Sequence, residues 1–287
     1  MKSKWFGIQF LSVLMFCGAA GATLINGTVN MDFADIAAGD VGYGYKIGVQ
    51  EVSVTQYEAS GLHLSDTGVA YNSYGSGDTN PVVGITWHEA AQYCNWLTSG
   101  STTVGAYTIS GSKVTAIKTR EEILLSGQTY YVLPTQDEWF NAAYVSGSST
   151  QLYSTVGGAL PTAEVDAVYD RTFDEYPPSS TPWSVDDGTF EINGTKNMMG
   201  NVWEWQESAV SGVNDPSNDS QMMSFQGGDW FLGSGKLRSD TYSEDERGND
   251  EYNIGMRIVA VPESATVSLI SLSALGFLFT RRLFGRL

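Results

Sequence analysis

One nine-residue segment concentrates the side chains that could do chemistry. It runs from Asn197 to Trp205 and reads Asn-Met-Met-Gly-Asn-Val-Trp-Glu-Trp, so it combines oxygen ligands with two indole rings. A hard cation such as Ca2+ takes about six to eight oxygen ligands from carboxylates, amides and backbone carbonyls. The alternative is a tight turn in which Asn197 and Glu204 only bond to the backbone. The segment therefore predicts either a cation site or a rigid turn.

Thiol and imidazole chemistry have little support in this chain. It holds two cysteines, Cys17 and Cys94, and none follows Cys94. Cys94 falls on the apolar face of a predicted helix, where a small buried thiol is the usual outcome and a reactive one is rare. The two histidines, His63 and His88, are isolated from each other and form no recognisable catalytic motif, so general acid–base catalysis gains no support.

Six carboxylates crowd into residues 240–251, beside Arg238 and Arg247: Asp240, Glu244, Asp245, Glu246, Asp250 and Glu251. Such a stretch can form a surface for a cation or a basic peptide. A solvated loop is the commoner outcome for a run of charges, and it is the one we expect here. The formal net charge of −17 over 287 residues argues against a nucleic acid partner.

The N-terminus has the pattern of a secretory signal. Lys2 and Lys4 precede an apolar run over residues 5–16, and Ala20-Gly21-Ala22 fits a small-residue cleavage site. We therefore expect residues 1–22 to be a signal peptide and the chain to be exported to the cell envelope, the cell surface or the extracellular space. The remaining domain is expected to span residues 23–260.

The C-terminal residues 261–287 form a second targeting element. Val261-Pro262-Glu263 is followed by an apolar run over residues 265–279 and then by arginines, which predicts a membrane segment with its basic end inside the cell. This order resembles the PEP-CTERM sorting signal, although Ser264 replaces its second proline. The resemblance implies an exosortase-type processing enzyme as partner and a transient membrane anchor. The alternative is a plain membrane anchor, and contact with a membrane is expected only through this segment.

Two capped helices and several short strands must position these residues. Thr86 with Glu89, and Thr135 with Glu138, form two capping-box patterns that each open a helix, and Gly100 closes the first one. A short helix is expected from Thr55. Strands or hairpin arms are expected at residues 45–54, 105–110, 113–118, 130–133, 201–206, 223–230 and 254–261. The pattern predicts an α+β domain with much irregular loop.

Motifs in a fixed order resemble the formylglycine-generating, or sulfatase-modifying factor, family. They are Tyr45-Lys46-Ile47-Gly48 with Glu51 to Tyr57, Pro81 to Trp87 with Ala90 to Leu97, Leu133-Pro134-Thr135-Gln136-Asp137-Glu138-Trp139, Gly200-Asn201-Val202-Trp203-Glu204-Trp205, Gly227-Gly228-Asp229-Trp230, Leu237-Arg238-Ser239 and Asn253-Ile254-Gly255-Met256-Arg257. The resemblance covers most of residues 30–260. It implies a C-type-lectin-like fold of the variant that this family adopts.

The resemblance also implies a calcium site and a copper site. The implied calcium ligands are Asn197, Gly200, Val202 and Glu204. The family's oxidases hold copper with two cysteines that follow the Gly-Gly-Ser segment, because soft sulfur ligands select Cu(I). Here that segment reads Gly227-Gly228-Asp229 and no cysteine follows it, so copper is not expected.

These observations favour an exported protein with a binding or structural role rather than a catalytic one. We expect a non-catalytic binding or structural module at the cell surface or in an extracellular matrix, with a peptide, glycan or other surface ligand that the sequence does not specify. The first alternative is a copper-dependent oxidase that converts a sulfatase cysteine to formylglycine. The second is a carbohydrate-binding, lectin-like module, which rests on fold analogy alone.

Overall fold

The computed structural model describes residues 23–64, 79–171, 181–216 and 218–262. The predicted signal peptide and nearly all of the predicted C-terminal sorting segment lie outside these residues. Within them, no helix is both long and apolar enough to cross a membrane.

In the described part of the chain, short strands form two central four-stranded sheets and three two-stranded ribbons. The first sheet has the order β12-β11-β10-β13, and the second has the order β3-β4-β14-β7. Their strands are β12 (Ser243–Glu246), β11 (Met222–Gln226), β10 (Trp203–Ala209), β13 (Ile254–Met256), β3 (Phe33–Ile36), β4 (Tyr45–Gly48), β14 (Val259–Val261) and β7 (Tyr130–Val132). The ribbons pair β1 (Thr23–Ile25) with β2 (Val29–Met31), β5 (Tyr107–Ser110) with β6 (Lys113–Ile117), and β8 (Val145–Ser146) with β9 (Ser149–Thr150).

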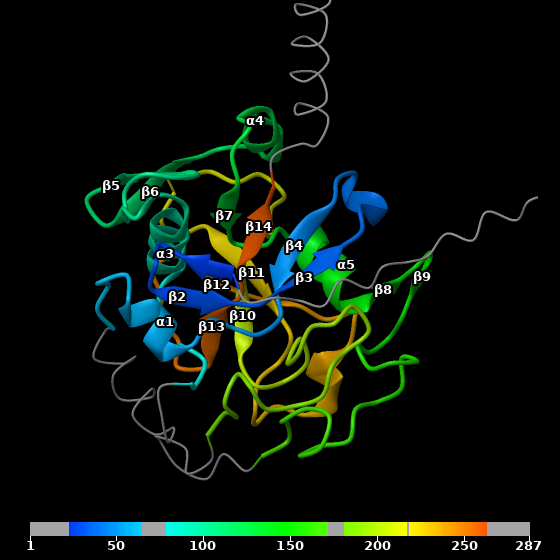
Figure 1. Cartoon of the computed structure of the whole chain (residues 1–287). Coiled ribbons are helices and arrows are strands. Elements are labelled where there is room, and N and C mark those ends of the chain that lie inside the picture. The colour runs from blue at the N-terminus through cyan, green and yellow to red at the C-terminus, as the bar shows by residue number, and fades with distance from the viewer. Residues whose placement is uncertain (1–22, 65–78, 172–180, 217, 263–287) are drawn as a thin grey trace, which may run out of the picture.

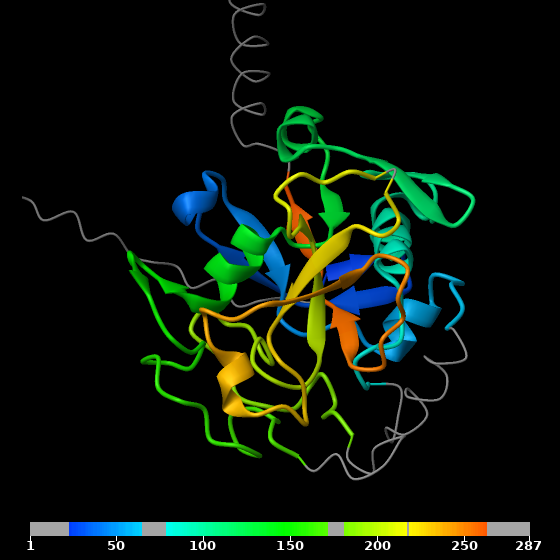
Figure 2. The same ribbon diagram turned by 180° about the vertical axis from the view of Figure 1, so that it is seen from behind.

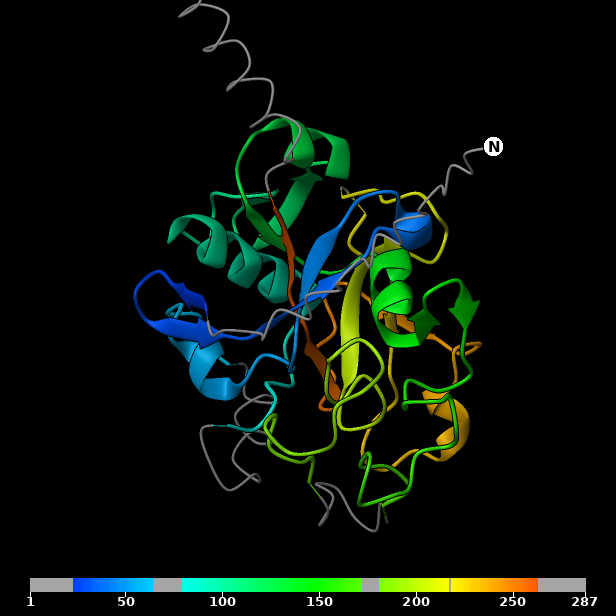
Figure 3. The ribbon, with the colours of Figure 1, turned by 45° about the vertical axis from the view of Figure 1, so that its right-hand side comes forward.

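Helices are few, and the two longest flank the central strands on opposite sides (Figures 1 and 2). The α-helices of the described residues are α1 (Val54–Glu58), α3 (Trp87–Ser99), α4 (Arg120–Leu125) and α5 (Gln136–Tyr144), and the 3-10 turns are η1 (Gly39–Val41) and η2 (Ser234–Leu237). The long loops that follow β9 gather with η2 at one end of the molecule in all views (Figure 3). The expected α+β architecture with two main helices and much irregular loop is confirmed.

The predicted helix starts are confirmed at the level of individual hydrogen bonds. Thr86 and Thr135 each cap a helix, and both capping boxes with Glu89 and Glu138 are complete. Gly100 ends α3 with a positive φ of 78°, a conformation that glycine adopts without steric cost. One predicted start was wrong, because α1 is capped by Ser53 rather than opened by Thr55.

Several predicted strands are shorter in the structure, and some elements were not predicted. The strand expected over 223–230 ends at Gln226, because Gly227 and Gly228 have φ values of 108° and 82°. The strand expected over 254–261 is two strands in different sheets, since β13 pairs with β10 whereas β14 pairs with β4 and β7. The acidic stretch expected as a solvated loop contains β12, an edge strand paired with β11. Helix α4 and strands β1 to β3 were also missed.

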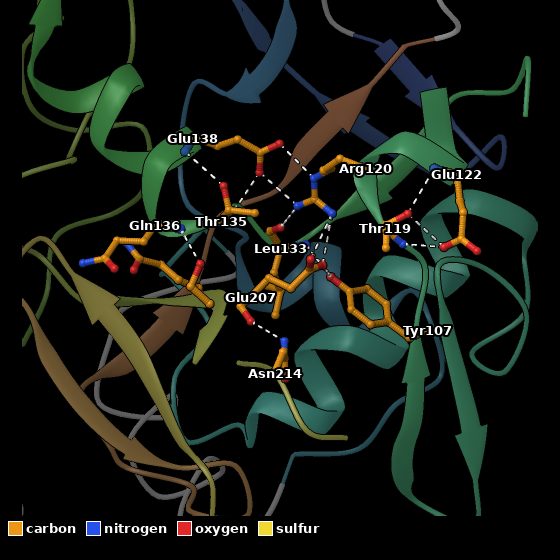
Figure 4. A network of polar contacts seen from close by, with 12 residues as sticks. Tyr107, Thr119, Arg120, Glu122, Leu133, Thr135, Gln136, Glu138, Glu207 and Asn214 are labelled. Carbon is orange, nitrogen blue, oxygen red and sulfur yellow. Dashed lines mark hydrogen bonds and ion pairs between the residues drawn. The ribbon is translucent and has the colours of Figure 1, made fainter. Parts of the chain in front are cut away.

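A largely buried arginine, Arg120, ties α4 to α5 and β10 (Figure 4). Arg120 Nε donates to Glu138 Oε1 at 2.9 Å, and its Nη1 donates to the Glu207 carboxylate at 3.1 and 3.2 Å. Tyr107 donates to Glu207 at 2.6 Å from the neighbouring hairpin. Burial alone would raise the pKa of Glu138, but the Arg120 guanidinium outweighs it, and the pKa is lowered. For Glu207 the same cation opposes burial without cancelling it, and the pKa is raised. One guanidinium therefore serves two buried carboxylates.

Removing that cation should destabilise the fold strongly. We expect Arg120→Met to lower the free energy of unfolding by about 3–5 kcal/mol, because Glu138 and Glu207 would remain buried without a partner. Urea denaturation measures the change. The matched control is Arg238→Met, which removes an arginine from an exposed pair with Asp240 and should leave the denaturation midpoint nearly unchanged. Equal midpoints for wild type and Arg120→Met would contradict this account of the network.

Candidate functional site

The Asn197–Trp205 segment folds as a tight turn that leads into β10. Asn197, Gly200 and Asn201 have φ values of 57°, 75° and 60°, which asparagine tolerates and glycine prefers. A Cβ on Gly200 would lie 2.1 Å from the carbonyl oxygen of Val168, so no side chain fits there. The turn brings both asparagine amides onto one carboxylate: Asn201 Nδ2 donates to Glu51 at 2.8 Å, and Asn197 Nδ2 at 3.3 Å.

Glu204 is the second residue of β10, and it is buried in the core, where it pairs with Arg257. The Arg257 guanidinium donates to both Glu204 oxygens, with the shortest distance 2.7 Å from Nη2 to Oε1. Trp139 Nε1 donates to Glu204 Oε2 at 2.6 Å. Arg257 also donates to the backbone carbonyls of Gly48, Val49 and Lys196 at 2.7–2.9 Å. All five N–H groups of the arginine are thereby used.

The charges around this pair do not balance. Glu51, Glu191 and Glu204 are all buried, and Arg257 is the buried cation among them. Burial raises the pKa of Glu51 to about 7 and that of Glu191 to about 7, and in each case Arg257 opposes the shift without cancelling it. The interior next to the signature segment is therefore rich in oxygen and short of positive charge.

The predicted calcium ligands fit this geometry in part. Asn197 Oδ1 is buried and accepts no hydrogen bond, and it lies so close to Gly188 that a Cβ there would approach to 2.6 Å. Both oxygens of Glu204, by contrast, already accept from Arg257 and Trp139. Among the described residues, no group of three or more His, Cys, Asp or Glu side chains is placed to hold a metal. A cation here would depend on amide and carbonyl oxygens, and the ligand set stays a prediction.

The loop that follows Gly227 and Gly228 is organised around a carboxylate. Asp229 is buried, and its Oδ1 accepts from the backbone amides of Phe231 and Leu232 at 3.1 and 2.8 Å. Its Oδ2 accepts from Asn253 Nδ2 at 2.6 Å. Burial raises the pKa of Asp229 to about 6, against these hydrogen bonds. The carboxylate folds the loop and is not exposed for chemistry.

A cavity of about 290 Å³ opens beside this loop. Its floor is the apolar face of the first sheet, where Trp203, Phe225 and Ile254 are nearly fully buried. The other lining residues come from the loops and the edge strand: Phe231, Leu232, Lys236, Ser243, Asp245, Glu251, Tyr252 and Asn253. Trp203 is the tryptophan in this lining, whereas Trp230 is buried in a separate apolar cluster.

The cavity lining includes neither Cys94 nor the two histidines. Cys94 is fully buried on α3, and burial raises its pKa. His88 is buried on the same helix, and its Nδ1 accepts from the Val114 amide at 3.2 Å. His63 is exposed. No described residue brings a second thiol near Cys94.

Residues 28–261 match the family described as "Sulfatase-modifying factor enzyme 1-like domain". The chain belongs to this family. Its fold is C-type-lectin-like, as the sequence motifs implied. No curated protein matches the chain.

Three solved structures that resemble this family member share the fold. The first is Treponema denticola variable protein 1, with a TM-score of 0.61, 18% identity, and coverage of 85% of this chain and 100% of the other. A crystal structure of CarF has a TM-score of 0.54 and 22% identity, and the match covers 80% of this chain and 96% of CarF. PvdO from Pseudomonas aeruginosa has a TM-score of 0.52 and 16% identity, and the match covers 76% of this chain and 81% of PvdO. At these identities the similarity shows the fold alone.

Sequence reasoning found the signature but missed most of its buried partners. Glu51 and Arg257 stood in the motifs that carried the family resemblance, yet nothing local indicated that they meet Asn197 and Glu204. Glu191 carried no signal, because it lies in a loop without periodicity. Phe231 and Tyr252, which line the cavity, were likewise missed.

The raised pKa of Glu191 predicts a pH-dependent stability. A carboxyl whose folded pKa is raised stabilises the fold at pH below about 4.5, and this contribution is lost as pH rises through about 7. The free energy of unfolding should therefore fall by up to about 3 kcal/mol between pH 5 and pH 8. Glu191→Gln should flatten the profile, whereas Glu121→Gln on the exposed face of α4 should not. Urea denaturation midpoints across this pH range measure the change in stability. If the midpoints of wild type and Glu191→Gln fall equally with pH, the prediction is wrong.

Proposed function

We propose that this protein is an exported, non-catalytic binding module of the sulfatase-modifying factor family. The observation that carries the proposal is the segment after Gly227-Gly228, which holds a buried, fully hydrogen-bonded Asp229 and no cysteine. Cys94 is the one cysteine beyond the predicted signal peptide, and it is buried on α3. A copper site built from two thiolates has no second sulfur within one chain.

The cavity beside this loop is the proposed binding site. Ligand sites are typically concave and largely apolar, with a few polar groups that give specificity. Here an apolar floor on a sheet meets charged and polar side chains at the rim, and rigid strands hold the floor in place. Export is supported by the signal-like N-terminus, and attachment or processing by the PEP-CTERM-like C-terminus and its implied exosortase.

A direct assay for cysteine oxidation tests the non-catalytic part of the proposal. We expect incubation of the protein with copper, oxygen and a Cys-x-Pro-x-Arg peptide to leave the peptide thiol unchanged by mass spectrometry, because one buried thiol cannot form the two-sulfur site. A family oxidase that retains its cysteine pair is the positive control. Aldehyde that forms with the wild type above a protein-free control, and disappears with Cys94→Ala, would overturn the proposal.

Calcium binding at the signature segment is a second proposal, and it is independent of the cavity. It is supported by the unpartnered, buried Asn197 Oδ1 and by the excess of carboxylates over arginine around it. A hard cation bound there would supply the missing positive charge, with Gly200 and Val202 as the predicted carbonyl ligands. Glu204 would have to release a hydrogen bond in order to take part.

Removal of calcium should lower the thermal midpoint if this site is filled. A ligand present at 100 times its dissociation constant adds about 2.7 kcal/mol, which corresponds to roughly 5–10 °C for a chain of this size. Asn197→Gly should abolish the effect of a chelator, since glycine keeps the positive φ and lacks the oxygen. The control is Asn201→Gly. Asn201 also has a positive φ and also donates to Glu51, but it is not a predicted ligand, so the thermal midpoint of this variant should still depend on calcium. A wild-type midpoint that a chelator does not change would sink the calcium proposal.

A further inference from the structure

The cavity beside β12 has an aromatic wall as well as an aromatic floor. The Phe231 and Tyr252 rings stack with centroids 5.9 Å apart and planes inclined by 17°. On the floor, Trp203 meets Phe225 edge to face at 5.2 Å. The rim and floor together therefore present several π faces and edges within about 290 Å³. Aromatic faces carry negative potential and attract cations.

The charged side chains at the same cavity are mostly carboxylates, and they lack compensation. Asp245 and Glu251 line it. Within the described residues, none of the carboxylates between 244 and 251 forms an ion pair. The pKa of Glu251 is raised, first by burial and then by the neighbouring Asp245 and Asp250. Like charges thus lie close together at this rim.

The arginine of the acidic stretch turns away from these carboxylates. Arg247 is fully buried, and its guanidinium lies over the Trp87 ring at 4.7 Å. It donates to the neutral oxygens of Asn214 and Gln221 rather than to an acid. The other nearby arginine, Arg238, is paired with Asp240. Both guanidinium groups are therefore engaged away from the cavity, and the rim keeps its negative charge.

We propose that this cavity binds a cationic side chain, arginine or lysine, of a basic peptide segment. The proposal rests on the proposed binding function and names the class of ligand. The alkyl stem would lie against Phe231 and Tyr252, and the cationic head would meet Asp245 and Glu251. Asp245 can accept this bond, because its two observed hydrogen bonds, from the Glu246 amide and from Asn249, both go to Oδ1.

The alternatives fit the same surface less well. A bare metal ion needs several oxygen ligands, whereas most of this lining is aromatic or aliphatic. An anionic ligand would meet two carboxylates and only one cation, Lys236. Lys236 lowers the attraction for a cationic ligand, so its removal should strengthen binding. Removal of Lys236 would instead weaken the binding of an anionic ligand, so the direction of the change in affinity separates the two ligand classes.

The experiment titrates the full exported domain with three defined peptides. The probe is an acetylated and amidated Gly-Arg-Gly-Arg-Gly peptide, and its counterparts carry glutamine or glutamate in place of arginine. Dissociation constants come from NMR, followed at the indole N–H of Trp203 on the cavity floor. We expect the arginine peptide to bind more tightly than the glutamine peptide by about tenfold, and the glutamate peptide not to bind.

Four variants assign the binding to this cavity. Glu251→Gln should weaken the arginine peptide about two- to fivefold, and Lys236→Gln should tighten it by a similar factor. Glu244→Gln is the matched control: it removes the same charge from β12, but Glu244 follows the alternation of the strand to the face opposite Asp245 and does not line the cavity. Its affinity should be unchanged. Ser243→Trp fills the cavity and should abolish binding.

Two results would overturn the inference. In the first, the arginine and glutamine peptides bind alike, or the arginine peptide does not bind. In the second, Glu244→Gln weakens binding as much as Glu251→Gln, which would mean that the arginine peptide only follows the overall negative charge. Neither result bears on the proposed non-catalytic function, whose failure is recognised separately by aldehyde formation in the oxidation assay.

Discussion

The arrangement of the whole domain depends on one buried guanidinium. Arg257 follows β13 and joins three distant parts of the chain: the end of β4, the turn before β10, and Glu204 within β10. A buried ion pair is weak evidence of net stability, but the loss of one partner leaves an uncompensated charge in the core. Arg257 therefore acts as a geometric constraint, because any packing that separates these segments leaves buried carboxylates without a partner. Arg257 also lies where the chain changes sheet, since β13 ends at Met256 and β14 begins at Val259.

Strand β10, which Arg257 holds through Glu204, borders both candidate sites. Its side chains alternate, so Glu204 and Gln206 face a buried polar layer while Trp203 and Trp205 face the apolar side. Trp205 lies in the core, and Trp203 lies two residues earlier, where the same apolar face reaches the cavity. The signature segment thus supplies an interior rich in oxygen on one face of the sheet and a ligand-sized hollow on the other. One short motif therefore borders two different environments, because a strand has two faces.

What the sequence could predict was local, and what it could not was long-range. The caps at Thr86 and Thr135 were predictable, because all their partners lie within three residues. The same signal exists at Thr119 with Glu122, but α4 has only six residues, too few to show helical periodicity. The contacts of Glu51 with Asn201, 150 positions away, and the parallel pairing of β10 with β13 depend on packing that no local pattern encodes. The acidic stretch was expected as a solvated loop because charge alone did not reveal its pairing with β11.

The stability network and the cavity rim use different residues, and this separation has a functional consequence. Glu204, Arg257 and Asp229 are buried and fully bonded, so substitutions there disturb the fold. Lys236 and Glu251 are exposed at the rim and take no part in the ion pairs that organise the core. The floor is fixed by strand pairing, which rim side chains do not influence. For the proposed binding function, this separation means that rim substitutions can change the ligand preference and leave the fold intact.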